Sequence, residues 1–360
     1  MGALYHAGSR LLVTGGGTGG HVIPAIEIAR AHRERANAPV FYAGGDGSLE
    51  ARLAERARIP FFPVSSGGFV GKSLSGKLAG LRKMAGGIPS AIKVLTESHP
   101  DLVIGTGGYV QVPVVLAARI RGIPVVLLEP NRVPGLANRL LRPLAVRTVV
   151  AGEQGQKGGG IPVAPGVRGP APLPERFFRN PPKILVMGGS QGARAINRKI
   201  PEIIGELRNT SVGPIEILHQ SGERWLEETR ESYRNLGLSA RVEGFLPGIS
   251  GLLSAQTLVI ARAGAMTIAE LTGSGTPAIY IPFPHSAGGH QEMNALSLAK
   301  EGGGWFWRED RLEDPAACAK DLARILMGRE ELFATARNAW RLSPAVPAEE
   351  WLQALETTIV

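Results

Sequence analysis

The sequence lacks paired cysteines, a long apolar run and a signal peptide. Its single cysteine, Cys318, excludes an intrachain disulfide and fits a reducing compartment. The apolar run that ends at Ala118 is interrupted by Arg119 and Arg121, and no run approaches the ~20 residues of a membrane-spanning helix. The first ten residues contain no apolar signal-peptide core. Any membrane contact is therefore expected to be peripheral.

Metal-binding motifs are also missing. The sequence contains no Asp-x-Asp pair, no H-E-x-x-H motif and no Cys/His ligand spacing. We therefore expect no metal and no other cofactor. Helix N-termini and arginines are the groups expected to neutralise an anionic leaving group.

What the chain does contain is a positive charge and enough apolar residues for real cores. Lys and Arg number 40 against 31 Asp and Glu, a formal charge of +9. This balance favours nucleotides, nucleic acid or anionic lipid as partners, although an ordinary soluble basic surface has the same composition. A length of 360 residues with 44% apolar content predicts two domains.

Short β-rich runs alternate with helical stretches along the chain, which predicts parallel sheets built from βαβ units. The expected strands are 11–14, 40–43, 102–105, 125–128 and 148–151, then 183–187, 215–219, 240–245, 258–261 and 278–281. The expected helices are 24–35, 193–207 and 347–355. The Gly- and Pro-rich segment 152–182 suits a connector more than a packed element.

The first chemical motif is the glycine loop Gly15–His21 (GGGTGGH), which follows a strand and opens a helix. Small residues allow close approach of a ligand, and helix N-termini present free N–H groups to anions. The loop also fits the dinucleotide fingerprint G-x-G-x-x-G, so a dehydrogenase is an alternative. Against it, the next strand ends in Gly44-Gly45-Asp46, so an acid for the ribose hydroxyls comes late. A tight structural turn remains a third interpretation.

A second loop, Gly188–Ala193 (GGSQGA), repeats this arrangement and adds the Ser190 hydroxyl. Two such loops, one in each half, predict a ligand outside the carboxyl ends of two facing sheets.

Two further motifs follow in the second half. Residues 261–270 end a strand and start a helix, where free amides suit phosphate and Glu270 suits a ribose diol; a solvated helix glutamate is the alternative. His285–Asn294 contains His290, Gln291 and Glu292 at a helix start, which suits either sugar hydroxyls or N-capping.

In this order, the motifs resemble those of glycosyltransferase family 28, within it the bacterial transferases that add N-acetylglucosamine to lipid I. The matching segments are 16–24 (GGTGGHVIP), 105–113 (GTGGYVQVP), 131–140 (NRVPGLANRL), 188–197 (GGSQGARAIN), 219–222 (HQSG), 262–270 and 291–295. The chain departs from the family pattern at Pro130, at 164–167 and at Ala263.

The resemblance implies an α/β GT-B fold, with two Rossmann-like doubly wound parallel-sheet domains facing across a cleft. The implied boundaries are 1–165 for the acceptor and membrane-associating domain, 166–340 for the UDP-GlcNAc domain, and 341–360 for a helix packing on the first domain. It also implies inverting transfer from UDP-GlcNAc to the C4 hydroxyl of MurNAc in a lipid-linked MurNAc-peptide diphosphate, giving lipid II.

By similarity, the residues that bind UDP-GlcNAc are Thr18, Gly19, Gly20, Asn131, Arg168, Ser190, Leu246, Ala265, Met266, Thr267, Ile268, Ala269, Glu270 and Gln291. Those in the acceptor and diphosphate loops are Gly16, Gly17, Gly107, Gly108, Tyr109 and Asn138. His21 is the predicted general base, because an imidazole accepts a proton near neutral pH. Hydrogen bonding to the acceptor diphosphate, or capping of its helix, is an equal alternative for His21.

Residues 59–96 contain no acid, and their basic and apolar side chains predict contact with an anionic membrane surface. The predicted contacts are Phe69, Lys72, Leu74, Leu78, Leu81 and Arg82. Core packing of the leucines is the alternative. The expected location is the cytoplasmic side of the bacterial cytoplasmic membrane, with no nucleic acid partner. Rival functions are a UDP-GlcNAc 2-epimerase, an NAD-dependent oxidoreductase and a non-catalytic UDP-sugar sensor.

Overall fold

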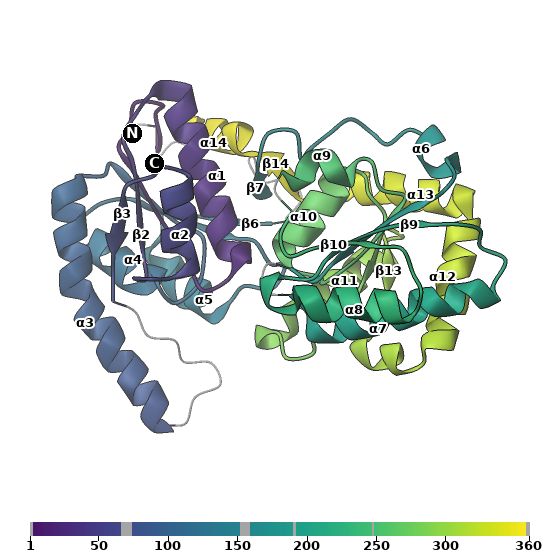
Figure 1. The fold of residues 1–360 in the computed structure, drawn as a ribbon. Helices are drawn as coiled ribbons and strands as arrows, with labels where there is room; N and C mark the ends of the chain where they lie inside the picture. Colours follow the sequence, from purple (N-terminus) through teal and green to yellow (C-terminus); the bar gives the residue numbers. More distant parts are fainter. Residues whose placement is uncertain (1–2, 66–73, 152–158, 190–191, 247, 358–360) are drawn as a thin grey trace. The chain divides into compact units, whose positions relative to one another are not determined.

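The computed structural model describes residues 3–65, 74–151, 159–189, 192–246 and 248–357, and they form two compact units (Figure 1). The first unit comprises Met1–Pro165 with Pro344–Val360, and the second comprises Gly166–Ser343. Each contains a six-stranded sheet whose recorded strand pairs are parallel. The predicted α/β class with two Rossmann-like parallel sheets is confirmed.

The sheet of the first unit has the order β3-β2-β1-β4-β5-β6. Its strands are β1 (Leu11–Thr14), β2 (Val40–Gly44), β3 (Phe61–Pro63), β4 (Leu102–Gly105), β5 (Val125–Glu129) and β6 (Arg147–Val150). Its helices are α1 (Gly19–Ala36), α2 (Leu49–Arg56), α3 (Leu74–Ser98), α4 (Gln111–Ile120), α5 (Leu136–Leu141), the 3-10 helix η1 (Arg142–Leu144) and α14 (Ala348–Glu356). The strand order reverses between β1 and β4, so a topological switch point lies there.

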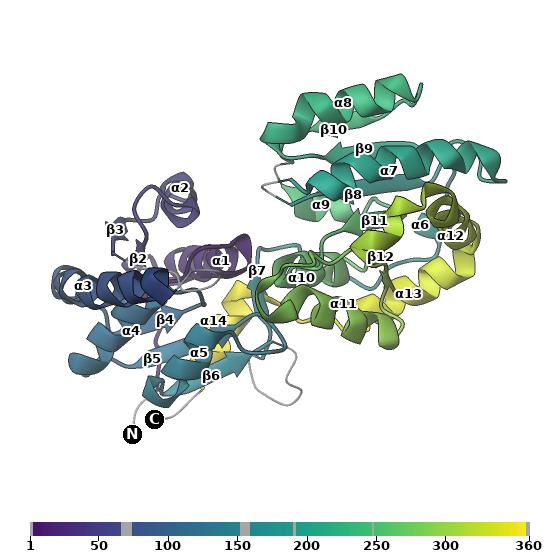
Figure 2. The same ribbon diagram turned by 90° about the horizontal axis from the view of Figure 1, so that it is seen from below.

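Alternate residues of β1 face opposite sides of this sheet, and both sides are covered. Leu11 and Val13 pack with α1 and α14, whereas Leu12 packs with α3 and α4. Figure 2 shows α3 and α4 beside each other in this unit. Because both faces are buried, the strands appear in the sequence as continuous apolar runs.

Helix α1 begins at Gly19, not at the predicted Pro24. Thr18 is its N-cap in an extended conformation, and Pro24 lies inside the helix. The glycine loop thus forms the first turn of the helix itself. The free N–H groups at a helix start belong here to the motif residues rather than to the apolar stretch after them.

The second unit has the strand order β10-β9-β8-β11-β12-β13. Its strands are β8 (Lys183–Met187), β9 (Glu216–Gln220), β10 (Arg241–Glu243), β11 (Leu258–Ala261), β12 (Ala278–Tyr280) and β13 (Trp305–Phe306). Its helices are α6 (Glu175–Phe178), α7 (Arg194–Glu206), α8 (Leu226–Asn235), α9 (Ile249–Leu253), α10 (Ala265–Gly273), α11 (His290–Lys300), α12 (Pro315–Met327) and α13 (Arg329–Arg341). Short 3-10 helices are η2 (Leu207–Asn209), η3 (Glu223–Trp225), η4 (Ala287–Gly289) and η5 (Glu309–Glu313).

This sheet is also covered on both faces. Ile184 and Val186 of β8 pack with α7 and α12, and Leu185 and Met187 pack with α9, α10 and α11. Figure 1 shows α7 and α8 side by side on one of these faces. The glycine loop after β8 therefore leaves the sheet at its centre, between two helical layers.

The segment 152–182 contains packed elements, which the prediction of a connector did not foresee. Its strand β7 (Ile161–Val163) pairs in parallel with β14 (Ala345–Pro347) within the first unit. In the second unit Arg176 is half-buried, and burial lowers its pKa to about 10. Its guanidinium donates to the carbonyl groups of Leu253 and Gln256, at 2.8 and 2.7 Å.

Helix α14 returns the chain to the first unit. Its buried side chains recur with the helical period at Ala348, Trp351, Leu352 and Leu355, and the last three join the core against α1. No helix in the part of the chain that the structure describes is long and apolar enough to cross a membrane.

Candidate active site

Two glycine loops meet at the switch point of the first unit. One follows β1 and the other follows β4, so both lie at the carboxyl edge of the sheet. The Gly16 N–H donates to the Gly107 carbonyl oxygen at 3.2 Å. Gly108 has φ +81, and a methyl group there would lie 2.3 Å from the Gly16 carbonyl oxygen. The backbones touch directly, which only glycine permits.

His21 lies between these loops, in the first turn of α1. Its Nδ1 is 3.2 Å from the Gly16 carbonyl oxygen and 3.3 Å from Thr18 Oγ1. A methyl group on Gly107 would lie 2.5 Å from His21 Cδ2, so the glycine makes room for the ring. Because a carbonyl only accepts, the neutral ring that donates to it carries hydrogen on Nδ1 and its basic lone pair on Nε2.

Other predicted residues of the first unit lie near these loops, at several depths. Asn131 follows β5, and its Nδ2 donates to Glu129 Oε1 at 3.0 Å. Asn138 of α5 is buried beneath the turn that follows β5 rather than at the surface. Tyr109 is half-buried, and burial raises its pKa.

The second glycine loop, between β8 and α7, is held by the neighbouring strand. The Gly188 N–H donates to the Gln220 carbonyl oxygen at 3.1 Å. Gly192 has φ +73, and a methyl group there would lie 2.1 Å from the Ser221 carbonyl oxygen. The predicted contact Ser190 lies outside the described residues.

A cavity of about 850 Å³ opens at this loop. Among its lining residues are Gly188, Gly192, Ala193, Arg194, Arg198, Arg262, Phe283, Gln291 and Glu309. Gln291 reaches it from α11, and its Oε1 accepts the Phe283 N–H at 3.0 Å. Arg262 forms an ion pair with Glu309. The sequence motifs contained Arg262 but did not assign it to the site; its place directly after β11 was the available signal.

Helix α10 supplies backbone groups more than side chains. Its N-cap Gly264 is extended, and its first turn contains no acid. Ala265, Met266, Ile268 and Ala269 are buried. Thr267 and Glu270 are half-buried, and no residue of α10 is among those that line the cavity.

Of the predicted nucleotide contacts that the structure describes in the second unit, Gln291 alone lines this cavity. The Arg168 guanidinium stacks on Trp340, 4.2 Å from the ring centre, and donates to the Trp340 carbonyl oxygen at 2.6 Å. Leu246 is buried in the core beside β8. Their roles in nucleotide binding stay predictions.

A buried network holds the second loop from below. Asn197 Nδ2 donates to the Ser221 carbonyl oxygen at 2.8 Å, and Asn197 Oδ1 lies 3.1 Å from His219 Nε2. His219 Nδ1 lies 3.0 Å from the Tyr233 hydroxyl. The Ser221 carbonyl only accepts, so the hydrogen sits on His219 Nε2 and Tyr233 donates to Nδ1.

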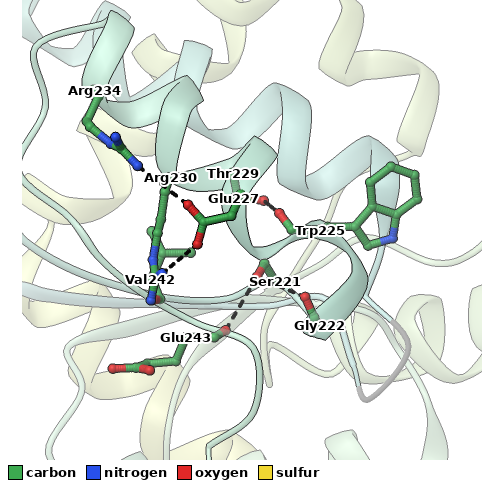
Figure 3. A network of polar contacts seen from close by, with 9 residues as sticks. All are labelled: Ser221, Gly222, Trp225, Glu227, Thr229, Arg230, Arg234, Val242 and Glu243. Atoms are coloured by element: carbon green, nitrogen blue, oxygen red, sulfur yellow. Dashed lines mark hydrogen bonds and ion pairs between the residues drawn. The ribbon is translucent and has the colours of Figure 1, made fainter.

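Ser221 extends this network to β10. Its N–H donates to the Glu243 carbonyl oxygen at 3.0 Å, and its hydroxyl also lies near that oxygen (Figure 3). Arg230 donates to the Val242 carbonyl oxygen and pairs with Glu227. The turn that packs against Gly192 is therefore fixed on both sides. His219 and Asn197 lie inside the matched motifs, but the sequence did not indicate this role.

This network predicts a stability that depends on pH. Burial lowers the pKa of His219 to about 3, from the ordinary 6.5. Between these values the unfolded chain binds a proton that the folded protein does not. The contribution of His219 to the free energy of unfolding is therefore complete above pH 6.5. It falls on acidification, by up to about 1.4 kcal/mol for each pH unit. Urea unfolding of the parent and of His219→Gln between pH 7 and 5 checks this: the parent is expected to lose more stability. Equal losses would contradict it.

The structure describes only part of the segment that is predicted to contact the membrane. Phe69 and Lys72 lie outside the described residues. Leu74, Leu78, Leu81 and Arg82 belong to α3, but the structure does not describe their side chains. No three His, Cys, Asp or Glu side chains gather to hold a metal ion among the residues that are described.

Comparison with known proteins matches both halves of the chain to one family. The model of the glycosyltransferase family 28 N-terminal domain matches residues 11–150, and that of the C-terminal domain matches residues 183–350. The chain belongs to glycosyltransferase family 28. Its motifs at the carboxyl edges of two parallel sheets lie within the matched residues, and the protein is a glycosyltransferase.

Curated relatives within the family are similar over nearly the whole chain. One is the "UDP-N-acetylglucosamine--N-acetylmuramyl-(pentapeptide) pyrophosphoryl-undecaprenol N-acetylglucosamine transferase" of Acidovorax sp. (strain JS42), 38% identical over 91% of this chain and 82% of its own. The protein of that name from Methylococcus capsulatus is 36% identical over 93% and 96%. The resemblance seen in the sequence is confirmed at the level of the family.

Solved structures agree on the fold. MurG of Acinetobacter baumannii superposes with a TM-score of 0.79 at 28% identity, covering 97% of this chain and 100% of that one. A putative UDP-N-acetylglucosamine 2-epimerase from Listeria monocytogenes reaches a TM-score of 0.62 at 12% identity, over 95% and 94%. The second likeness shows a shared fold and nothing more.

Proposed function

We propose that this protein transfers N-acetylglucosamine from UDP-GlcNAc to the C4 hydroxyl of MurNAc in lipid I, with inversion, and so forms lipid II for peptidoglycan synthesis. The observation that carries the proposal is the 38% identity, across 91% of the chain, to transferases named for this donor and this acceptor. The position of the matched motifs at the carboxyl edges of both sheets supports it.

The donor is proposed to bind the second unit. Amides of the loop at Gly188–Ala193 and of the α10 N-terminus bind its diphosphate, because free N–H groups and helix dipoles favour anions there. Neither α7 nor α10 has an acid in its first turn to oppose this. Glu270 accepts from the ribose, and Gln291 contacts the sugar. The UDP leaving group needs no metal in this scheme, and Arg194 at the start of α7 adds positive charge at the cavity.

The acceptor is proposed to bind the first unit, at the loops of Gly16 and Gly108. The C4 hydroxyl gives its proton to His21 Nε2 while its oxygen bonds to the anomeric carbon of the donor sugar. The bond from that carbon to the UDP oxygen breaks, and UDP leaves with the electron pair. Attack from the face opposite UDP inverts the anomeric configuration. Fixing both reactants in line lowers the entropy cost of the step.

UDP release from UDP-GlcNAc, measured with and without a lipid I analogue, tests this function. We expect release that depends on the analogue and a product that contains both sugars. Loss of UDP-GlcNAc without acceptor would instead favour an epimerase, and tight UDP binding without release a sensor. An absorbance change at the nicotinamide band would indicate an oxidoreductase. Each of these three results would overturn the proposal.

We further propose peripheral binding to the cytoplasmic face of the bacterial membrane. The acid-free stretch of residues 59–96 supports it, as do the apolar side chains of α5, where Leu136 and Leu140 are 45% and 67% exposed beside Arg139. Nucleic acid is not a proposed partner. Flotation with liposomes is expected to recover more protein when they contain anionic lipid; equal recovery would remove the electrostatic part of the proposal.

A further inference from the structure

A chain of buried hydrogen bonds runs under the two loops of the first unit. The Gly107 N–H donates to Gln111 Oε1 at 2.9 Å, and Gln111 Nε2 donates to Asn138 Oδ1 at 2.6 Å. Asn138 Nδ2 then donates to the Leu128 carbonyl oxygen at 3.0 Å and to Glu129 Oε2 at 2.9 Å. Gln111, Asn138 and Glu129 are all buried, and they come from three separate elements.

Glu129 ends this chain with a full set of donors. Its Oε2 also accepts the Gly135 N–H at 2.9 Å. Its Oε1 accepts both the N–H and the side-chain Nδ2 of Asn131, each at 3.0 Å. An ionised carboxylate accepts all four hydrogen bonds, whereas a protonated carboxyl would turn a hydrogen toward one of the donors. One buried side chain therefore fixes the whole turn from Asn131 to Gly135.

Backbone groups determine the direction of every hydrogen bond in the chain. The Gly107 N–H can only donate, so Gln111 presents its oxygen to it and its amide nitrogen to Asn138. The Leu128 carbonyl can only accept, so Asn138 presents its nitrogen there and its oxygen to Gln111. A flip of either amide would set donor against donor or acceptor against acceptor. Buried polar groups arranged in this way specify one structure.

This chain of hydrogen bonds reaches the predicted base, His21, through Gly107. The residue has φ +113, and its missing side chain leaves the space that the His21 imidazole occupies. A movement of Gly107 toward the ring would therefore displace the His21 imidazole. The other end of the chain fixes Asn131, a predicted donor contact.

We propose that Gln111, Asn138 and Glu129 are positioning residues that lock the loop of Gly107 and the turn of Asn131 into one geometry. They hold His21 and Asn131 in place for transfer and make no contact with substrate themselves. The kinetic part of this inference rests on the proposed function. It assigns Glu129 no proton transfer, because its two oxygens are already used by four donors.

Two variants test the chain at different points. Gln111→Met keeps the length of the side chain but removes the acceptor for Gly107 and the donor for Asn138. Glu129→Gln keeps the shape but turns an NH₂ group toward two of the donors. We expect each to lower kcat for transfer on the order of 10- to 100-fold, as misplacement of reacting groups does. UDP affinity is expected to stay unchanged, since its predicted diphosphate loop lies in the second unit.

The pH profile separates positioning from proton transfer. If Glu129 only positions, the acidic limb of kcat against pH keeps its midpoint in Glu129→Gln while the plateau falls. Loss of that limb would make Glu129 the base and overturn the proposal.

A readout without activity keeps the proposal independent of the proposed function. Amide hydrogen exchange at Gly107 is expected to rise in Gln111→Met, and exchange at Asn131 and Gly135 to rise in Glu129→Gln. The matched control is Gln256→Leu, which removes another buried glutamine whose Nε2 donates to the Leu252 carbonyl oxygen at 3.0 Å. It should leave these amides and kcat as in the parent. Unchanged exchange at Gly107 in folded Gln111→Met would refute the positioning role of this chain of hydrogen bonds, whether or not the parent transfers sugar.

Discussion

Gly108→Ala is expected to abolish transfer and to lower the free energy of unfolding by about 2–5 kcal/mol, the sum of backbone strain and overpacking. The new methyl group would lie 2.3 Å from the Gly16 carbonyl oxygen, and φ at this position is +81. The clashing atom belongs to the backbone, so no side-chain rotation relieves it. Either loop must move, and the movement reaches His21 through Gly16.

Gly122 provides the matched control. It also has positive φ, +69, but no atom lies within 4 Å of the added methyl group. Gly122→Ala carries the strain without the clash and is expected to cost about 1–2 kcal/mol with transfer intact. Urea unfolding and acceptor-dependent UDP release compare the two. Equal effects in both variants would show that the close contact between the loops is not what requires glycine.

His21→Ala is expected to lower kcat by about 10²–10⁴, the usual contribution of a general base. The lone pair on Nε2 is lost, while the diphosphate loop of the second unit is untouched, so UDP affinity should not change. Steady-state kinetics with a lipid I analogue measures the effect. A drop below about tenfold would remove the base role from His21.

His21→Gln decides between the two interpretations of this residue. The glutamine amide can still donate to the Gly16 carbonyl oxygen or to an acceptor phosphate, but it cannot take a proton at neutral pH. If His21 is the base, His21→Gln is as slow as His21→Ala. If His21 only binds or caps, His21→Gln retains most of the activity.

Much of the fold could be predicted because its central strands are covered on both faces. Strands β1, β4, β8 and β11 appear in the sequence as uninterrupted apolar runs, and their predicted limits match the structure. The edge strands β3 and β13 were not predicted. They have three and two residues, too few to show a pattern.

The loops of the candidate site could be predicted from the sequence, but the buried side chains that hold those loops in place could not. Glycine runs between a strand and a helix indicate anion binding from local sequence alone, and they led to Gly16 and Gly188. The supports depend on partners far along the chain: Gln111 and Asn138 are separated by 27 residues, and Asn197 and His219 by 22. No local period or spacing marks such pairs. Arg168 was predicted as a nucleotide contact by similarity, but nothing in the sequence indicates that its guanidinium stacks on Trp340.

The return of α14 to the first unit has a consequence for synthesis. The second unit is one continuous stretch, Gly166–Ser343, whereas the first also needs Pro344–Val360, with Trp351 in its core and Glu356 paired to Arg35 at 2.8 Å. A ribosome makes the amino end first, so the earlier-made sheet waits for α14 until the whole of the second unit has been made. The later-made sheet has all its strands before then. The order of completion is thus the reverse of the order of synthesis.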